Sequence, residues 1–227
     1  VTETSPGHRV FPCTEGIRYH VEIPEGCPSH GCGLILDVHG WTMNADMQDK
    51  NTEMRRRGRE NGYVVVQPTA PGIVPTWDLT RRTEPGFDFV SDLAHVLGVD
   101  PRRRHVMGFS QGGWMTWRML CAHTSYFASY APIAGIDEGC SFRGDDVPTG
   151  EADVLIIHGR EDFVVQIVVS EAIRDRMLEA WPFGIPFVLE KDASHEARRW
   201  TSANGTILEF WEHRYSAPGA VLGVVLG

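Results

Sequence analysis

A serine between glycines lies where a short apolar stretch gives way to a helical one. The run Gly108-Phe109-Ser110-Gln111-Gly112 has the pattern Gly-x-Ser-x-Gly. At such a strand–turn–helix junction the serine is held in a strained conformation, and its hydroxyl projects above the sheet. A chain with 24 glycines in 227 residues produces this pattern by chance in roughly one case in ten. The chemistry indicated is nucleophilic attack by Ser110 on a carbonyl carbon.

An acyl-transfer serine needs an acid and a base, which follow it in the order Ser, Asp or Glu, His on a sheet of this kind. The apolar run from Val154 to His158 leads into Gly159 and then a short polar loop that carries Asp162. We predict Asp162 as the acid. Glu161 is the nearest competitor, and the structural alternative is a loop carboxylate that caps the next helix.

Two histidines follow Asp162. His195 comes a few polar residues after the apolar run Phe187 to Glu190, which places it in a loop at a strand end. His213 lies in a stretch that we interpret as an amphipathic helix, where a surface or hydrogen-bonded histidine is expected. We therefore predict His195 as the base that accepts the Ser110 proton while Asp162 fixes its tautomer.

Two backbone N–H groups are needed to stabilise the oxyanion. One is expected from Gln111, which follows the nucleophile at the start of a helix. The second is expected from Trp41, because the apolar run from Leu34 ends in His39-Gly40 and enters a loop there. The alternative for His39-Gly40 is a simple strand end.

Large apolar residues near the same strand ends are candidates for a substrate pocket. Trp41 and Trp77 are favoured because both lie in loops with polar or proline neighbours. Taken singly, each candidate is more often a core residue than a pocket residue. The predicted pocket residues are His39, Trp41, Met43, Trp77, Trp114 and Phe163.

Apolar runs and helical periodicity alternate along the chain. The expected strands are 17–23, 34–38, 63–67, 105–109, 127–133, 154–158 and 187–190, and the expected helices are 46–60, 87–97, 111–122, 168–179 and 206–213. This order predicts an α/β fold with a mostly parallel central sheet and helices on both faces. We expect a single domain over 1–227, with no cap domain, because 134–152 is too short to roof the site.

Charge and composition narrow the classes of partner. The formal net charge of -9 disfavours nucleic acid, and we interpret Arg55, Arg56, Arg57 and Arg59 as a solvated helix face. No apolar run reaches the roughly 18 residues that a membrane span requires. We expect a monomer that binds an ester substrate, with no nucleic acid, no membrane span and no cofactor.

Five cysteines occur without any Cys-x-x-Cys pair, so no metal site is expected. They favour one or two disulfides in a secreted protein. Because the sequence begins with Val1 rather than Met, we expect a mature or trimmed chain from which the signal peptide is absent. The alternative is five reduced cysteines in a cytosolic protein.

Several segments together resemble the α/β-hydrolase family of secreted polyhydroxybutyrate-depolymerase-like and feruloyl-esterase-like enzymes. The matching pieces are His39-Gly40-Trp41, 63–68, 99–103, 108–115, 131–135 and 158–162. The resemblance implies an α/β-hydrolase fold and an esterase activity without a cofactor. It also implies a disulfide between Cys121 and Cys140, and it leaves the pairing of Cys13, Cys27 and Cys32 open. Many depolymerase-like relatives carry Cys where this chain has Trp41, which implies a differently shaped entrance.

The expected function is that of a serine carboxylesterase. The first substrate class is short hydroxyalkanoates or related aliphatic polyesters and oligomers, and the second is feruloyl or acetyl esters on plant cell-wall polysaccharide. A catalytically silent carbohydrate-binding protein is the alternative of another class. A peptidase or thioesterase with the same three residues is a further alternative, because its chemistry is identical.

Overall fold

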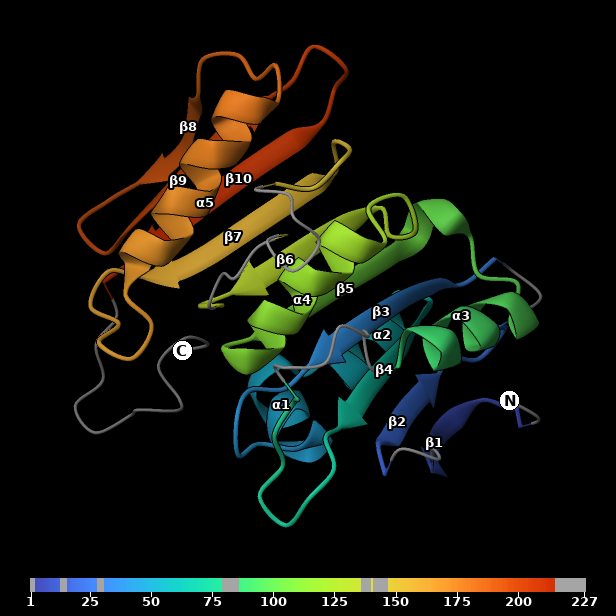
Figure 1. The fold of residues 1–227 in the computed structure, drawn as a ribbon. Coiled ribbons are helices and arrows are strands. Elements are labelled where there is room, and N and C mark those ends of the chain that lie inside the picture. Colours follow the sequence, from blue (N-terminus) through green and yellow to red (C-terminus); the bar gives the residue numbers. More distant parts are fainter. Residues whose placement is uncertain are drawn as a thin grey trace.

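A ten-stranded sheet runs through the computed structural model, which describes residues 3–12, 16–27, 31–78, 86–135, 140 and 147–214. The parallel strands, in spatial order, are β4 (Tyr63–Thr69), β3 (Gly33–Val38), β5 (Arg104–Phe109), β6 (Ser129–Ile133), β7 (Asp153–Gly159) and β10 (Ile207–His213). Antiparallel strands extend both sides: β2 (Arg18–Ile23) and β1 (Gly7–Pro12) beyond β4, and β9 (His195–Thr201) and β8 (Phe187–Lys191) beyond β10 (Figure 1).

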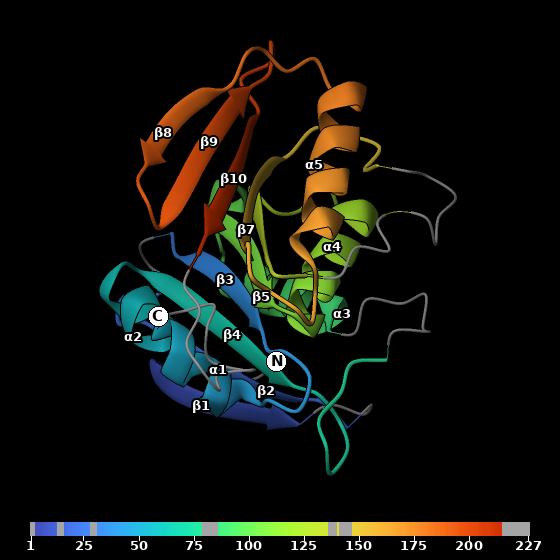
Figure 2. The ribbon, with the colours of Figure 1, turned by 90° about the vertical axis from the view of Figure 1, so that its left-hand side faces the viewer.

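Helices cover both faces of this sheet. Figure 2 shows α1 (Ala45–Thr52) and α2 (Met54–Glu60) on one face. On the opposite face lie α3 (Phe87–Val96), α4 (Gln111–Ala122) and α5 (Ile167–Ala180). A short 3-10 turn, η1 (Pro101–Arg103), leads into β5. The predicted α/β architecture is therefore confirmed, and the carboxyl ends of the parallel strands meet at one edge of the sheet.

The central strands are buried because their apolar runs face helices on both sides. Val64, Val65 and Val66 of β4 are fully buried, as expected for continuous apolar sequence. A smaller cluster, formed by Met43, Phe109, Ile133 and Ala134, packs close to the carboxyl ends of β5 and β6. The core therefore extends to the edge at which the predicted site residues lie.

Three differences separate the predicted elements from the observed ones. The stretch predicted as a helix over 206–213 is strand β10, and its burial alternates residue by residue. Strands β1 and β9 were not predicted. The helix predicted over 46–60 is two helices, because Glu53 adopts a left-handed conformation (φ 51°) between them. Residues 136–139 and 141–146, within the segment too short for a cap, lie outside the described residues.

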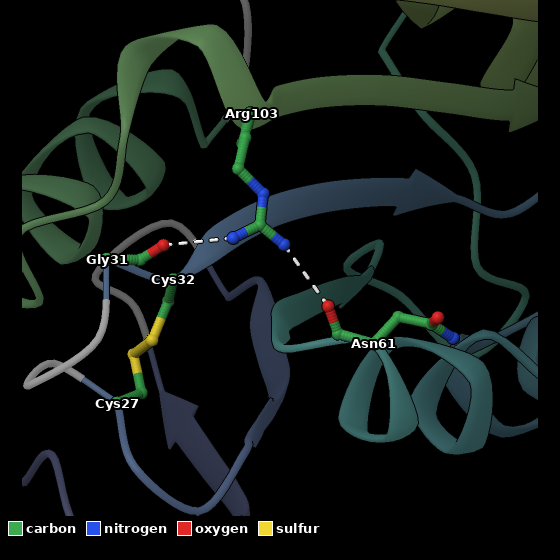
Figure 3. Close-up of a disulfide and its surroundings, with 5 residues drawn as sticks. All are labelled: Cys27, Gly31, Cys32, Asn61 and Arg103. Carbon is green, nitrogen blue, oxygen red and sulfur yellow. Dashed lines mark hydrogen bonds between the residues drawn. A yellow bond between two sulfur atoms is a disulfide. The ribbon is translucent and has the colours of Figure 1, made fainter.

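Two disulfides lie within the part of the chain that the structure describes. Cys121 pairs with Cys140, as the resemblance implies, and Cys27 pairs with Cys32. Figure 3 shows that Arg103 lies beside the second disulfide and donates hydrogen bonds to the backbone oxygens of Gly31 (3.0 Å) and Asn61 (3.1 Å). Residue 13, the fifth cysteine, lies outside the described residues. Within the described chain, none of the helices is both long and apolar enough to cross a membrane.

Candidate active site

Ser110 lies between the end of β5 and the first residue of α4. Its backbone is strained, with φ 54° and ψ −114°, values that L-residues other than glycine rarely adopt. Its N–H donates to the carbonyl oxygen of Ile133 on the neighbouring strand β6 at 2.8 Å. The predicted elbow is therefore formed, and the serine lies at a helix N-terminus where the helix dipole favours negative charge.

Gly112 lets the first turn of α4 approach the end of β3. A Cβ atom at this position would overlap the carbonyl oxygen of Val38 and lie within 2.8 Å of that of His39. Gly40 allows the loop after β3 to come close to the elbow, since a Cβ there would lie 3.3 Å from Ser110 Cβ. These two glycines bring the His39-Gly40-Trp41 loop against the nucleophile.

Both expected oxyanion donors, the N–H groups of Trp41 and Gln111, lie where this loop meets the nucleophile. Gln111 is the first residue of α4, so its N–H has no partner inside the helix. No described residue accepts a hydrogen bond from the N–H of Trp41, whereas the next two N–H groups donate to Pro75 and Gly40. Two N–H groups are thus available near Ser110 for a developing negative charge.

His39 is fully buried at the end of β3 and holds the shape of this loop. The N–H of Ala70 donates to His39 Nε2 (3.0 Å), so Nδ1 carries the ring proton and donates to the carbonyl oxygen of Gly40 (2.6 Å). Burial lowers the pKa of His39 to about 4. The imidazole is therefore neutral at pH 7 and acts on the loop backbone.

Asp162 follows β7 and folds over its own loop. Its Oδ1 accepts from the N–H groups of Val164 and Val165, both at 2.9 Å. Its Oδ2 lies 3.7 Å from Nε2 of His158, which donates to the carbonyl oxygen of Val165 at 2.7 Å. Burial lowers the pKa of His158. Because a neutral His158 donates its Nε2 proton to Val165, the Oδ2 atom of Asp162 can accept a hydrogen bond from another donor.

His195 is the first residue of β9, and the structure does not bring it to Asp162. Its Nδ1 lies 3.1 Å from Oδ1 of Asp192, and its Nε2 lies 3.2 Å from Oε1 of Glu190. Ser194 Oγ also lies 3.2 Å from Nδ1. The two ring nitrogens are therefore engaged by the strand β8 and the turn that connects it to β9.

His213 is the histidine next to Asp162. It ends β10, which runs parallel to β7, and it is in register with Gly159. Its backbone oxygen accepts from the N–H of Arg160 at 2.8 Å, and its ring carbon Cε1 lies 3.1 Å from the position of a Cβ on Gly159. Burial lowers the pKa of His213, and the negative charge of Asp162 opposes this effect.

The two histidines are themselves direct cross-strand neighbours, because His195 and His213 are in register between β9 and β10. Both lie at the carboxyl edge of the parallel strands, since β9 is antiparallel and begins there. The structure records no hydrogen bond from Ser110 Oγ to either imidazole. Strands β6 and β7 lie between β5, which carries Ser110, and β10.

The predicted pocket residues fall into two groups. Trp41 and Phe163 are 58% and 77% exposed at the edge of the sheet near Ser110 and Asp162. His39, Met43, Trp77 and Trp114 are buried. Sequence reasoning missed three further exposed apolar residues in the loops after β4 and β7, namely Ile73, Val74 and Val164. Bulky apolar residues in a Pro-containing loop were the signal that could have found the first two.

Within the described residues no group of three or more His, Cys, Asp or Glu side chains could hold a metal ion. The candidate site therefore consists of a strained serine, two unspent N–H groups and a carboxylate beside a neutral histidine. Residue types of this kind are those that nucleophilic acyl transfer uses.

Comparison of the whole chain with solved structures supports the same fold. An acetyl xylan esterase from Aspergillus awamori superimposes with a TM-score of 0.71 over 92% of both chains at 12% identity. A thermostable esterase matches 76% of this chain and 51% of its own with a TM-score of 0.59 at 18% identity. The chain has an α/β-hydrolase fold. No family model matches it.

Proteins similar to this chain in sequence have names that refer to different substrates. A bifunctional acetylxylan esterase/xylanase of Neocallimastix patriciarum is 27% identical over 66% of this chain and 22% of its own length. Poly(3-hydroxyalkanoate) depolymerase C of Paucimonas lemoignei is 26% identical over 61% and 34%, respectively. Feruloyl esterase C of Emericella nidulans is 26% identical over 67% and 57%. The chain spans less than two thirds of each of these relatives.

Proposed function

We propose that this protein is a serine carboxylesterase with Ser110 as its nucleophile. The observation that carries the proposal is the strained backbone of Ser110 at the N-terminus of α4. The backbone N–H groups of Trp41 and Gln111, which have no acceptor among the described residues, suit the oxyanion of a tetrahedral intermediate. Strain of this kind persists where the surrounding structure over-determines it, as the tight packing of Gly112 against β3 does here.

Asp162 and His213 are the acid and base that the geometry favours. They come from neighbouring parallel strands, and the charge of Asp162 acts on the pKa of His213. The ring of His195, which the sequence predicted as the base, is instead engaged by Glu190 and Asp192. Because no hydrogen bond joins Ser110 to His213, the proposal requires the two to approach when substrate binds, as catalytic hydrogen bonds commonly tighten in complexes.

The proposed reaction has two halves. Ser110 Oγ attacks the ester carbonyl carbon, its proton passes to His213, and the carbonyl oxygen becomes an oxyanion held by the N–H groups of Trp41 and Gln111. Collapse breaks the ester C–O bond, and His213 returns the proton to the departing alcohol. Water then attacks the acyl-enzyme with His213 as base, which releases the acid and restores the serine.

The rim of the site favours an apolar ester. Loops after β3, β4 and β7 each expose apolar side chains there, namely Trp41, Ile73, Val74, Phe163 and Val164. An open apolar rim suits short hydroxyalkanoates or related aliphatic polyester oligomers, which we propose as the first substrate class. Feruloyl or acetyl esters of plant cell-wall polysaccharide are the second, supported by the names of two of the relatives above.

A small ester panel tests the reaction and the substrate class together. Purified protein should hydrolyse p-nitrophenyl butyrate, and Ser110→Ala should lose this activity while keeping the thermal unfolding midpoint of the wild type within a few degrees. Equal, measurable rates for the two proteins would refute the serine mechanism, whereas no hydrolysis of any ester in the panel by the wild type would favour the catalytically silent carbohydrate-binding alternative. Turnover of methyl ferulate without turnover of hydroxybutyrate trimer would overturn the polyester preference.

A pair of histidine variants tests the base. We expect His213→Ala to lower kcat by roughly 10²–10⁴-fold, the usual contribution of a general base. His195→Ala serves as the matched control from the adjacent strand and should stay within about threefold of wild type, because its ring contacts Glu190 and Asp192 rather than Asp162. A large loss in His195→Ala with an active His213→Ala would return the role to His195.

The two disulfides also support a proposal about location. Disulfides such as Cys121–Cys140 persist in oxidising compartments and are rare in the cytosol. We propose that the protein functions outside the cytoplasm. Mass spectrometry of protein alkylated without reduction, from both culture medium and cells, tests this; alkylated, reduced Cys121 in a cell-retained protein would contradict it.

A further inference from the structure

The segment that follows β4 lies against both halves of the proposed oxyanion site, and Trp77 contacts each of them. The backbone N–H of Trp77 donates to Oε1 of Gln111 at 2.9 Å. The indole Nε1–H of Trp77 donates to the carbonyl oxygen of His39, also at 2.9 Å. One residue therefore joins the helix that offers the Gln111 N–H to the loop that offers the Trp41 N–H.

Neighbouring residues of the same segment add parallel connections. Ala70 holds the imidazole of His39 through the hydrogen bond described above. Pro75 accepts from the N–H of Thr42 at 3.0 Å, and Thr42 is held at φ 65°. Hydrogen bonds thus hold the loop immediately before and immediately after Trp41, while the N–H of Trp41 has no acceptor among the described residues.

On the helix side, Gln111 makes reciprocal contacts through its side-chain amide. Its Nε2 donates to Oγ1 of Thr76 at 3.1 Å, while its Oε1 accepts from Trp77. Trp77 is only 3% exposed and its ring lies 4.9 Å from that of His39. The hydrogen bonds that Trp77 makes to Gln111 and His39 are buried, so removing one partner leaves the other without water as a substitute, which is costly.

We propose that Trp77 is a positioning residue that sets the separation of the two oxyanion donors. This inference rests on the proposed function of the site. The sequence predicted Trp77 as a residue that lines the substrate pocket. Its burial and its two hydrogen bonds favour a role in positioning the oxyanion donors instead. Donors that are fixed before substrate arrives need no reorganisation when the negative charge develops, which is the basis of oxyanion stabilisation. The contribution of Trp77 is therefore to the transition state and to adducts that carry an oxyanion.

Trp77→Phe tests the inference, because it keeps an aromatic ring and the backbone N–H but removes the indole donor to His39. We expect kcat for p-nitrophenyl butyrate to fall roughly 10-fold or more, short of the 10²–10³-fold for loss of a whole oxyanion donor. KM should stay within twofold. Affinity for an alkyl trifluoromethyl ketone, whose adduct with Ser110 places an oxyanion in the site, should fall in parallel with kcat/KM.

Trp117→Phe is the matched control, since Trp117 is equally buried on α4 and has no part in the proposed machinery. It should lose similar stability while kcat and inhibitor affinity stay within about twofold of wild type. If Trp77→Phe changes kinetics no more than Trp117→Phe does, the inference is overturned.

A second variant protects the test against misfolding of the first. Gln111→Met keeps the backbone N–H of residue 111 and removes the acceptor of the Trp77 amide, so it should weaken the trifluoromethyl ketone in the same way. Wild-type inhibitor affinity in Gln111→Met would also overturn the inference. Activity retained by Ser110→Ala would instead refute the proposed function, so the two failures are distinguishable.

Discussion

Gly159 and His213 lie opposite one another on the parallel strands β7 and β10, and the imidazole of His213 packs over the glycine backbone. A side chain at position 159 would meet the ring at 3.1 Å. The absence of a Cβ atom at residue 159 therefore decides where the ring of His213 can stand relative to Asp162, three residues further along the chain.

Gly159→Ala should displace the imidazole of His213 by a few tenths of an ångström. Because small misplacements of catalytic groups are costly, we expect kcat to fall roughly 10-fold with little change in KM. Steady-state kinetics on p-nitrophenyl butyrate checks this. Gly184→Ala is the control, since its Cβ meets only ordinary contact at 3.6 Å; equal activity of the two variants would contradict the importance of this packing.

Gly112→Ala should destabilise the fold as well as the site. Its Cβ would overlap the carbonyl oxygen of Val38, so α4 must shift away from β3. Overpacking of this kind costs typically about 1–3 kcal/mol, and backbone contacts raise the value. Urea unfolding measures the loss directly. A variant as stable as the wild type would show that α4 can move freely against β3.

Stability should fall as the solution is acidified from about pH 6.5 toward pH 4. The pKa of His39 is about 4 in the folded protein against 6.5 as the ordinary value, so between these values the unfolded chain binds the extra proton. Folding stability then decreases by about 1.4 kcal/mol per pH unit from this group. Burial lowers the pKa of His158 as well, which adds to the effect in the same direction.

Urea unfolding at pH 7.0, 5.5 and 4.5 tests this dependence. A His39→Gln variant should show a shallower slope over the same range, because a non-titrating side chain replaces the imidazole. Identical slopes in the variant and the wild type would assign the acid sensitivity to other groups.

The two disulfides should contribute unequally. Cys121 and Cys140 are 19 residues apart and Cys27 and Cys32 only five. On the chain-entropy model, loops of these lengths correspond to about 3 and about 2 kcal/mol, respectively. Unfolding free energies of the two double Cys→Ser variants measure the difference; a larger loss from the shorter loop would show that native contacts, rather than loop length, dominate.

Much of the site was readable from sequence because its parts are local. The elbow at Ser110 is specified by glycines within four residues, and α4 begins and ends where the sequence predicted. Asp162 was predicted in the same way, from one apolar strand and the loop that follows it. Each of these predictions depends on neighbours in the chain and needs no knowledge of which strands pair.

The position of His213 could not be read so directly, because it depends on strand order. The stretch from Ile207 was interpreted with helical spacing, although Leu208, Phe210 and Glu212 alternate toward one face as in a strand. Pairing of β10 directly with β7 then brings His213 to Asp162, although 50 residues separate them in the chain. The contacts of Trp77 were beyond sequence reasoning for the same reason, since they join the loop after β3, the segment after β4 and the start of α4.

Strand β10 has hydrogen-bonded neighbours on both sides, β7 and β9, whereas β8 pairs with β9 alone among the described strands. Amide hydrogens of β8 should therefore exchange with solvent through fraying, while those of β10 should exchange only when the sheet itself opens. On gentle heating the outer strand would open first, and the pair formed by Asp162 and His213 would outlast it. The hairpin formed by β8 and β9 thus confines local unfolding to the outer edge of the sheet, away from the proposed active site.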